Sequence, residues 1–251
     1  MADFFWFSDT QWTRIEPLLP RGTRGKPRVD DRRVLSGIVH ALQSGGRWGD
    51  CPEPVYGPKK TLYNRFVRWA ERGVWEAIFE SLAGAEDTPD RLFIDSSSIK
   101  VHRTAGGAKG GPAHGIGTSR GGRNTKLHAV CDIKGRPLVL LLTPGNMHDM
   151  RVAKACIETL PPSADLVADK GYDSNDLRAW LAARGTRAVI PPKRHRKVKL
   201  AFDAAVYKQR NVIERMFCRF KDWRRVAMRF DRNIKTFMAT IVLAATVIWW
   251  L

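Results

Sequence analysis

Cysteine is scarce in this sequence, and so are the features of a secreted or membrane protein. The four cysteines are far apart and form no Cys-x-x-Cys pair, so neither a zinc site nor a disulfide framework is indicated, and reduced thiols in a cytosol are expected. The first residues include an acid but no basic region, so we expect no signal peptide. The apolar run Phe237–Leu251 is shorter than the roughly 20 residues that a membrane span needs. We interpret it as a buried helix.

Acidic residues are also few. Asp and Glu number 25 against 43 Lys and Arg, which gives a net charge of +18 and a pI near 10.3. A chain this basic usually meets a polyanion, either nucleic acid or an anionic membrane surface. The basic residues are interleaved with aromatic ones and form no long low-complexity tail. This pattern favours a folded nucleic-acid-binding protein over a disordered basic arm.

The first third of the chain has the spacing of short helices. Ser8 and Gln11 form a capping-box pattern before one of them, and further helices are expected near 30–44, 58–69 and 74–79. The segment 47–58 contains Gly and Pro and is expected to be a loop. The third helix directs a basic, polar face outward, formed by Lys59, Lys60, Asn64, Arg65 and Arg68. Such a face is typical of a helix-turn-helix reader of DNA, but a plain helical bundle with a charged surface fits equally well.

A small, polar segment at 83–89 indicates a boundary, after which strands and helices alternate. This order predicts a mixed sheet with helices on both sides, an α/β architecture. Residues 104–124 are rich in glycine and are expected to form a long loop. The closing helix, 233–251, is apolar enough to pack against the sheet. The expected strands are 91–95, 126–133, 137–143, 165–169 and 186–190, and the expected helices are 149–160, 174–184, 207–221 and 233–251.

The segment 207–221 lacks Pro and Gly and is predicted to be one continuous helix. At 3.6 residues per turn, four polar residues fall within an arc of about 60°; they are Tyr207, Arg210, Glu214 and Lys221. An apolar stripe lies next to this arc, so the helix can hold one carboxylate at the edge of the core with cations beside it. That arrangement fits a metal site on a nucleic-acid enzyme, but also an ordinary amphipathic helix with a solvated face.

Two further acids, Asp95 and Asp169, each end an expected buried strand, where open α/β sheets place their sites. With Glu214 they form three carboxylates without a His or Cys cluster, which suits Mg²⁺ or Mn²⁺. Two such ions can assist in-line displacement at a phosphodiester. Each acid also has a plain interpretation: a strand-end cap, a turn residue, or an ion pair with Arg210. Asp149 is interpreted as a helix N-cap, although its neighbour His148 leaves a supporting role in the site open.

Several motifs resemble those of the DDE transposases of small bacterial insertion sequences, in the family named after insertion sequence five. The helix matches the pattern Tyr-x2-Arg-x3-Glu-x6-Lys in full, with Tyr207, Arg210, Glu214 and Lys221. The resemblance spans essentially the whole chain. The other matching segments are Phe-Ile-Asp95-Ser-Ser, Val-Ala-Asp169-Lys-Gly-Tyr172-Asp, Ser119-Arg-Gly-Gly122 leading into Thr125-Lys-Leu-His128, and Thr143-Pro-Gly-Asn146-Met-His148-Asp149.

The resemblance implies an RNase H-like catalytic domain over 90–251, preceded by a small all-helical DNA-binding domain over 1–84. It implies that Asp95, Asp169 and Glu214 are catalytic and bind two Mg²⁺ (or Mn²⁺) ions. Activated water would cut the ends of the element, and the freed 3′-OH would attack target DNA. The implied partners are terminal repeats and target DNA, bound by a homodimer in the bacterial cytoplasm at the nucleoid, with no membrane.

Basic residues are assigned to DNA on the same grounds. Arg210 and Lys221 would hold phosphates beside the metals, and Tyr207 either stacks on a sugar or a flipped base or packs in the core. Backbone phosphates are expected at Arg120, Arg123 and the run 193–199, which includes Lys193 and Arg194. Two other functions fit the same residues: an RNase H-like structure-specific endonuclease without strand transfer, and a catalytically silent DNA-binding regulator.

Overall fold

The computed structural model describes residues 4–20, 28, 30–84, 89–106, 114–198 and 200–251. Its contacts divide the chain into two compact units. The helical unit comprises Met1–Ala83, His102–Ala108 and Phe220–Leu251, and the sheet unit comprises Gly84–Val101 and Lys109–Arg219. Part of the expected glycine-rich loop, residues 107–113, lies outside the described residues.

The helical unit begins with the helices that the spacing predicts. Ser8 and Gln11 form the expected capping box at the start of α1 (Asp9–Ile15), and Gly45 ends α2 (Asp31–Ser44) in the left-handed conformation, with φ +74°. The expectation of a loop over 47–58 is wrong in part, because two short helices interrupt it. The turn η1 (Glu16–Leu18) lies between α1 and α2. The elements after α2 are η2 (Trp48–Asp50), α3 (Glu53–Tyr56), α4 (Lys59–Glu71) and α5 (Val74–Ala83).

The C-terminal end of the chain belongs to the same unit. It contains α11 (Arg224–Ala227), the short strand β7 (Met228–Arg229), α12 (Ile234–Ala245) and the turn η5 (Thr246–Trp250), and α6 (Arg103–Gly106) also lies in this unit. The expectation that the closing helix packs against the sheet is wrong. Its buried apolar residues pack against α4 and α5 instead. No described helix is long and apolar enough to cross a membrane.

The sheet unit has the predicted mixed α/β architecture, and its sheet is of the RNase H-like type. Its strands are β1 (Arg91–Val101), β2 (Gly117–Ser119), β3 (Gly122–Cys131), β4 (Pro137–Pro144), β5 (Asp165–Val167) and β6 (Arg187–Val189). β3 pairs antiparallel with β1, β2 and β4. β5 runs parallel to β1 and to β6. The central order is therefore β4-β3-β1-β5-β6.

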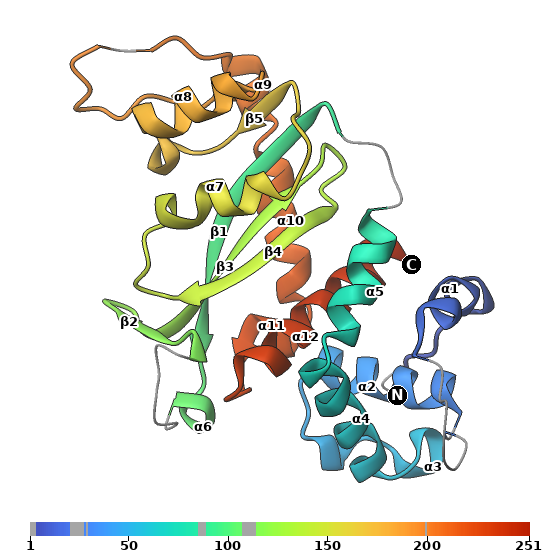
Figure 1. Cartoon of the computed structure of the whole chain (residues 1–251). Helices are drawn as coiled ribbons and strands as arrows, with labels where there is room; N and C mark the ends of the chain where they lie inside the picture. The colour runs from blue at the N-terminus through green and yellow to red at the C-terminus, as the bar shows by residue number, and fades with distance from the viewer. Residues whose placement is uncertain (1–3, 21–27, 29, 85–88, 107–113, 199) are drawn as a thin grey trace. The chain divides into compact units, whose positions relative to one another are not determined.

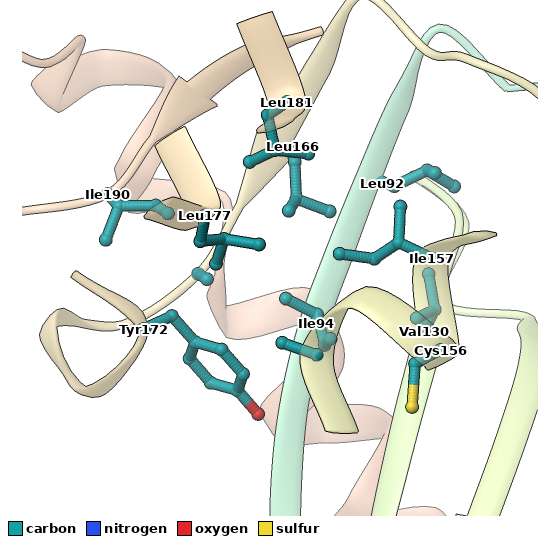
Figure 2. Close-up of a cluster of buried hydrophobic side chains, with 12 residues drawn as sticks. Leu92, Ile94, Val130, Cys156, Ile157, Leu166, Tyr172, Leu177, Leu181 and Ile190 are labelled. Carbon is teal, nitrogen blue, oxygen red and sulfur yellow. The ribbon is translucent and has the colours of Figure 1, made fainter. Parts of the chain in front are cut away.

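Helices cover both faces of this sheet, with α7 (Met150–Glu158) and α10 (Asn211–Lys221) on opposite sides (Figure 1). A buried cluster fills the space between the strands, α7 and α8 (Asn175–Ala183), as Figure 2 shows. The strands contribute Leu92, Ile94 and Leu166 to this cluster, and Leu177 and Leu181 come from α8. The sheet unit therefore has its own hydrophobic core, which packs the first half of β1 and the strand β5 against α7 and α8.

Two expectations about site-bearing elements are wrong. β1 does not end at Asp95 but continues to Val101, because β3 pairs with it over its whole second half. The predicted helix 207–221 is two helices, α9 (Ala204–Lys208) and α10. The chain turns at Gln209 and Arg210, where the amide of Val212 donates to the carbonyl of Gln209 at 3.0 Å.

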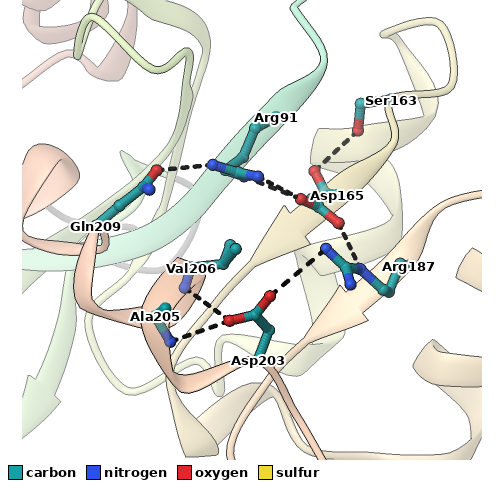
Figure 3. Close-up of polar contacts among 8 residues, drawn as sticks. All are labelled: Arg91, Ser163, Asp165, Arg187, Asp203, Ala205, Val206 and Gln209. Carbon is teal, nitrogen blue, oxygen red and sulfur yellow. Dashed lines mark hydrogen bonds and ion pairs between the residues drawn. The ribbon is translucent and has the colours of Figure 1, made fainter.

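A buried ion network ties the parallel strands together (Figure 3). Asp165 pairs in register with Arg91 on one side and Arg187 on the other, and its carboxylate accepts from both guanidinium groups at 2.7 Å. Arg91 also donates to the side chain of Gln209 at 2.7 Å, just before α10. The bond from Arg187, with help from Arg91 and against the effect of burial, holds the pKa of Asp165 below its ordinary value.

We expect Asp165→Asn to lower the free energy of unfolding by about 2 kcal/mol at pH 7, because hydrogen bonds to charged groups are lost. Since the pKa of Asp165 is depressed in the fold, its stabilisation is present above the unfolded pKa of about 3.9 and is lost as the pH falls. The difference between the variant and the parent protein should therefore shrink below about pH 4. Urea unfolding at several pH values measures this. Asp176→Asn, which alters an exposed surface pair, is the control and should change little.

Candidate active site

The candidate site forms where β1 and β5 separate. The last parallel pair joins Phe93 to Val167, and Asp95 and Asp169 each lie two residues farther along their segments. β5 ends at Val167 whereas β1 continues, so the two acids flank the space at the carboxyl end of β5. Burial raises the pKa of Asp95, and the nearby Asp169 carboxylate raises it further, against the lowering effect of Arg210. The two acids are therefore close enough to repel each other.

Arg210 joins the first acid to the third. Its guanidinium donates to Oδ2 of Asp95 at 2.6 Å and to Oε1 of Glu214 at 2.5 Å. The side chains of Asp95 and Arg210 are each 17% exposed, whereas that of Glu214 is 55% exposed. The buried Nε of Arg210 has no hydrogen-bond partner among the described residues. The plain interpretation of Glu214 as an ion-pair partner of Arg210 is thus correct, and the pair extends to Asp95.

The donor set suits a hard cation, since it consists of carboxylate oxygens whose mutual repulsion a cation would relieve. Within the described ranges, however, no three Asp, Glu, His or Cys side chains lie close enough to hold one metal ion. Arg210 occupies oxygens of both Asp95 and Glu214, so a metal ion bound by these two acids would take the place of the guanidinium. Asp169 contributes one oxygen, Oδ1, to a 2.8 Å bond with the amide of Gly171.

A fourth acid, Asp149, belongs to this region. It occupies the N-cap position of α7, but its side chain makes no capping bond. Its Oδ1 instead accepts from Ser96 Oγ at 2.8 Å and lies 3.0 Å from Lys126 Nζ. Asp149 therefore binds β1 at the residue next to Asp95 and also binds β3. In the sequence, the motif that ends at His148-Asp149 is the feature that points to a supporting role of Asp149 in the site.

His128 completes the surroundings of Asp149 on the side of β3. Its Nδ1 lies 3.6 Å from Asp149 Oδ1, and its Nε2 lies 2.8 Å from Thr143 Oγ1. Burial lowers the pKa of His128 to about 4, so the imidazole is neutral at pH 7 and forms no ion pair with Asp149. The charge that faces Asp149 from β3 comes from Lys126.

The basic residues assigned to phosphate lie mainly on the surface of the sheet unit. Arg120 and Arg123 are exposed at the β2–β3 turn. Lys193 is half-buried and Arg194 is exposed. Their segment is anchored by the buried Asp173, which accepts from the amide of Lys193 at 2.8 Å and from Arg196 at 2.7 Å. Lys199, at the end of the run, lies outside the described residues.

The remaining residues of the helix motif are placed differently from one another. Tyr207 lies on α9, half-buried, with its ring edge-on to the half-buried Phe202 at 5.6 Å. Lys221 is exposed at the end of α10. Because α9 and α10 are separate helices, the face predicted for a continuous helix does not exist as such.

On α4, the expectation that the basic residues all face outward is wrong for Arg65. Lys59, Lys60 and Asn64 are exposed, but Arg65 is only 8% exposed. It forms an ion pair with Asp31 and stacks over the ring of Trp69 at 5.1 Å. A shallow pocket of about 240 Å³ lies on this face, lined by Lys60, Thr61, Asn64, Arg65 and Arg68.

Comparison with protein families gives two matches along the chain. Residues 7–79 match a family described as "Putative transposase of IS4/5 family". Residues 86–249, more than half of the chain, match the family "Transposase DDE domain".

Individual relatives and a solved structure agree with these matches. The chain is 36% identical over 126 residues to the "Putative transposase for insertion sequence element IS6501" of Brucella ovis, covering 50% of this chain and 97% of the relative. It is 30% identical over 178 residues to the "Putative transposase for insertion sequence element IS402" of Burkholderia cepacia, covering 66% of this chain and 81% of the relative. In fold, it resembles the piggyBac transposase of a synaptic complex with hairpin DNA, with a TM-score of 0.52, 8% identity, and coverage of 96% of this chain and 72% of that one.

We expect Arg210→Ala to lower the free energy of unfolding by about 2–3 kcal/mol when measured in EDTA. The substitution leaves the largely buried Asp95 carboxylate beside Asp169 without its cation. Arg215→Ala, at an exposed position on α10 five residues later, is the control and should be nearly neutral. Equal unfolding midpoints in urea for both variants would show that the bridge between Asp95 and Glu214 is not formed in solution.

Proposed function

This chain belongs to the DDE transposase family, and from that premise we propose that it cuts the ends of its insertion sequence and joins their 3′-OH groups to target DNA. The observation that supports this proposal is the link that Arg210 makes between Asp95 and Glu214, with Asp169 near enough to Asp95 to raise its pKa. Acids and a guanidinium in one place suit a reaction at a phosphodiester, where developing negative charge must be balanced.

The chemistry proposed for this site is metal-assisted. When bound by Asp95, Asp169 and Glu214, two Mg²⁺ or Mn²⁺ ions supply the positive charge that in-line displacement at phosphorus requires. In the structure Arg210 offsets the negative charge of Asp95 and Glu214. With metal ions bound to these carboxylates, its guanidinium would be available to bind a phosphate oxygen. We assign the exposed Lys221 to a neighbouring backbone phosphate.

We propose that residues 1–84 recognise the terminal repeats and that residues 90–251 carry out catalysis. The exposed Lys59, Lys60 and Asn64 on α4 offer donors for base edges and phosphates. Two element ends must be processed together, so a homodimer on DNA is proposed as the active assembly, working at the nucleoid in the bacterial cytoplasm.

We expect Asp169→Asn to reduce metal-dependent cleavage of terminal-repeat DNA by about 10³-fold or more, because one carboxylate of the reacting centre is neutralised. DNA binding should persist or become tighter, because a negative charge near phosphate is removed. Single-turnover cleavage and an electrophoretic binding assay measure the two effects. Asp176→Asn is the matched control on α8 and should cut normally. Cleavage by Asp169→Asn at the parent rate would contradict the proposal.

Joining of pre-nicked ends to a plasmid separates the proposed transposase from its nearest alternative. A structure-specific endonuclease would cut but would not join. A catalytically silent DNA-binding regulator would bind the ends but would neither cut nor join them. In such a protein Asp169→Asn could change only the binding affinity.

We expect the double variant Asn64→Ala, Arg68→Ala to weaken binding to terminal-repeat DNA by about 10- to 100-fold, because contacts to base edges are lost. Binding to random DNA should weaken far less. Titrations with both DNAs at one salt concentration measure the ratio. Arg14→Ala removes the same charge from an exposed site on α1 and is the control. An equal loss on both DNAs would show that α4 supplies only charge.

A further inference from the structure

Tyr172 is a buried polar side chain of the sheet unit that the proposed chemistry leaves unused. It ends the turn η4 (Lys170–Tyr172), which directly follows Asp169. The residue is 1% exposed, and its ring is part of the hydrophobic cluster between the sheet, α7 and α8. Figure 2 shows the ring extending from the turn toward β1, with the hydroxyl at its far end.

This hydroxyl has no hydrogen-bond partner among the described residues. A buried hydroxyl without a protein partner is costly to the fold, and in native proteins such a group calls for an explanation, such as a bound water or ion, stored strain or a catalytic role. Phenylalanine would fill the same space in the cluster without that cost. The hydroxyl is therefore not explained by packing.

The ring packs in the hydrophobic cluster, and its turn starts directly after Asp169, one of the acids of the candidate site. Burial, followed by the carboxylates of Asp149, Asp95 and Asp169, raises the pKa of the Tyr172 phenol far above its ordinary value. The group therefore keeps its proton at every working pH and can act as a hydrogen-bond donor. The contacts of Asp149 with Ser96 and Lys126 fall on its Oδ1, so that acid is already held by other donors.

We propose that Tyr172 is a further catalytic residue, whose hydroxyl donates a hydrogen bond to a reacting oxygen bound among Asp95, Asp149 and Asp169. This inference rests on the proposed function. The oxygen belongs either to the scissile phosphate or to the attacking water, since both accept a hydrogen bond in the same way. A donor held in place before the reaction needs no reorganisation when charge develops on that oxygen.

The test compares Tyr172→Phe with Tyr56→Phe. Tyr56 is also buried, but its hydroxyl donates to the carbonyl of Phe5 at 2.8 Å, far along the chain in the helical unit. Tyr172→Phe should slow cleavage by about 10- to 100-fold while its unfolding midpoint stays equal to or above that of the parent. Tyr56→Phe should lower the midpoint and leave the cleavage rate at saturating DNA unchanged.

Two DNA substrates then separate the two sources of the oxygen. If Tyr172 holds the scissile phosphate, Tyr172→Phe slows both the cleavage of intact ends and the joining of pre-nicked ends. If it holds the attacking water, only cleavage is slowed, because joining uses the 3′-OH. Either result supports the inference.

Parent rates in both assays would overturn the inference, as would a loss of rate accompanied by a lowered midpoint like that of Tyr56→Phe. Asp169→Asn is run in parallel. Normal cutting by Asp169→Asn would refute the proposed function itself, whereas an inactive Asp169→Asn beside a fully active Tyr172→Phe would refute only the role of Tyr172.

Discussion

The ion pair between Arg210 and Asp95 is the contact on which the arrangement of the site depends. Asp95 lies in a largely buried position beside Asp169, where an unbalanced carboxylate would be costly. The guanidinium of Arg210 offsets that charge and at the same time binds Glu214 at the start of α10. One side chain thus connects the central strand to the helix that carries the third acid.

The sheet makes this arrangement possible through the unequal lengths of its strands. β1 is paired with β3 far beyond Asp95, whereas its parallel pairing with β5 ends at Phe93. On the side of β3 the pairing of β1 therefore extends well past Asp95, whereas on the side of β5 it stops two residues before Asp95. At the first paired positions of the parallel strands, Asp165 forms ion pairs with Arg91 and Arg187 (Figure 3). Arg91 also donates a hydrogen bond to Gln209. The start of β1 is therefore connected by a hydrogen bond to the turn that precedes α10.

Features that depend on local periodicity could be predicted from the sequence. The capping box at Ser8, the β3–β4 hairpin and the place of Asp169 just after β5 are examples, because each follows from side-chain type and spacing. Features set by distant partners could not. The chain breaks at Gln209 because residues remote in sequence, Arg91 and Asp95, bind Gln209 and Arg210. Arg65 turns inward because Asp31 and Trp69 are available to it, and helical spacing alone contains no information on either.

Asp149 and Asp173 show how the same residue type takes different roles in one region. Asp149 is bound by Ser96 and Lys126 on the side of β1 and β3. The side chain of Asp173 is buried and held by Arg178, Arg196 and the amide of Lys193. Burial alone would raise the pKa of Asp173, but these hydrogen bonds outweigh it and lower the pKa strongly. In the sequence, Asp169 and the turn that ends at Tyr172 lie between Asp149 and Asp173. Asp173 directly follows this turn, and its carboxylate binds the amide of Lys193 and the side chain of Arg196 in the basic segment. One residue therefore connects the turn that carries Asp169 and Tyr172 to the segment that we assign to phosphate. The basic segment around Lys193 is in this way joined through Asp173 to the part of the chain that carries Asp169.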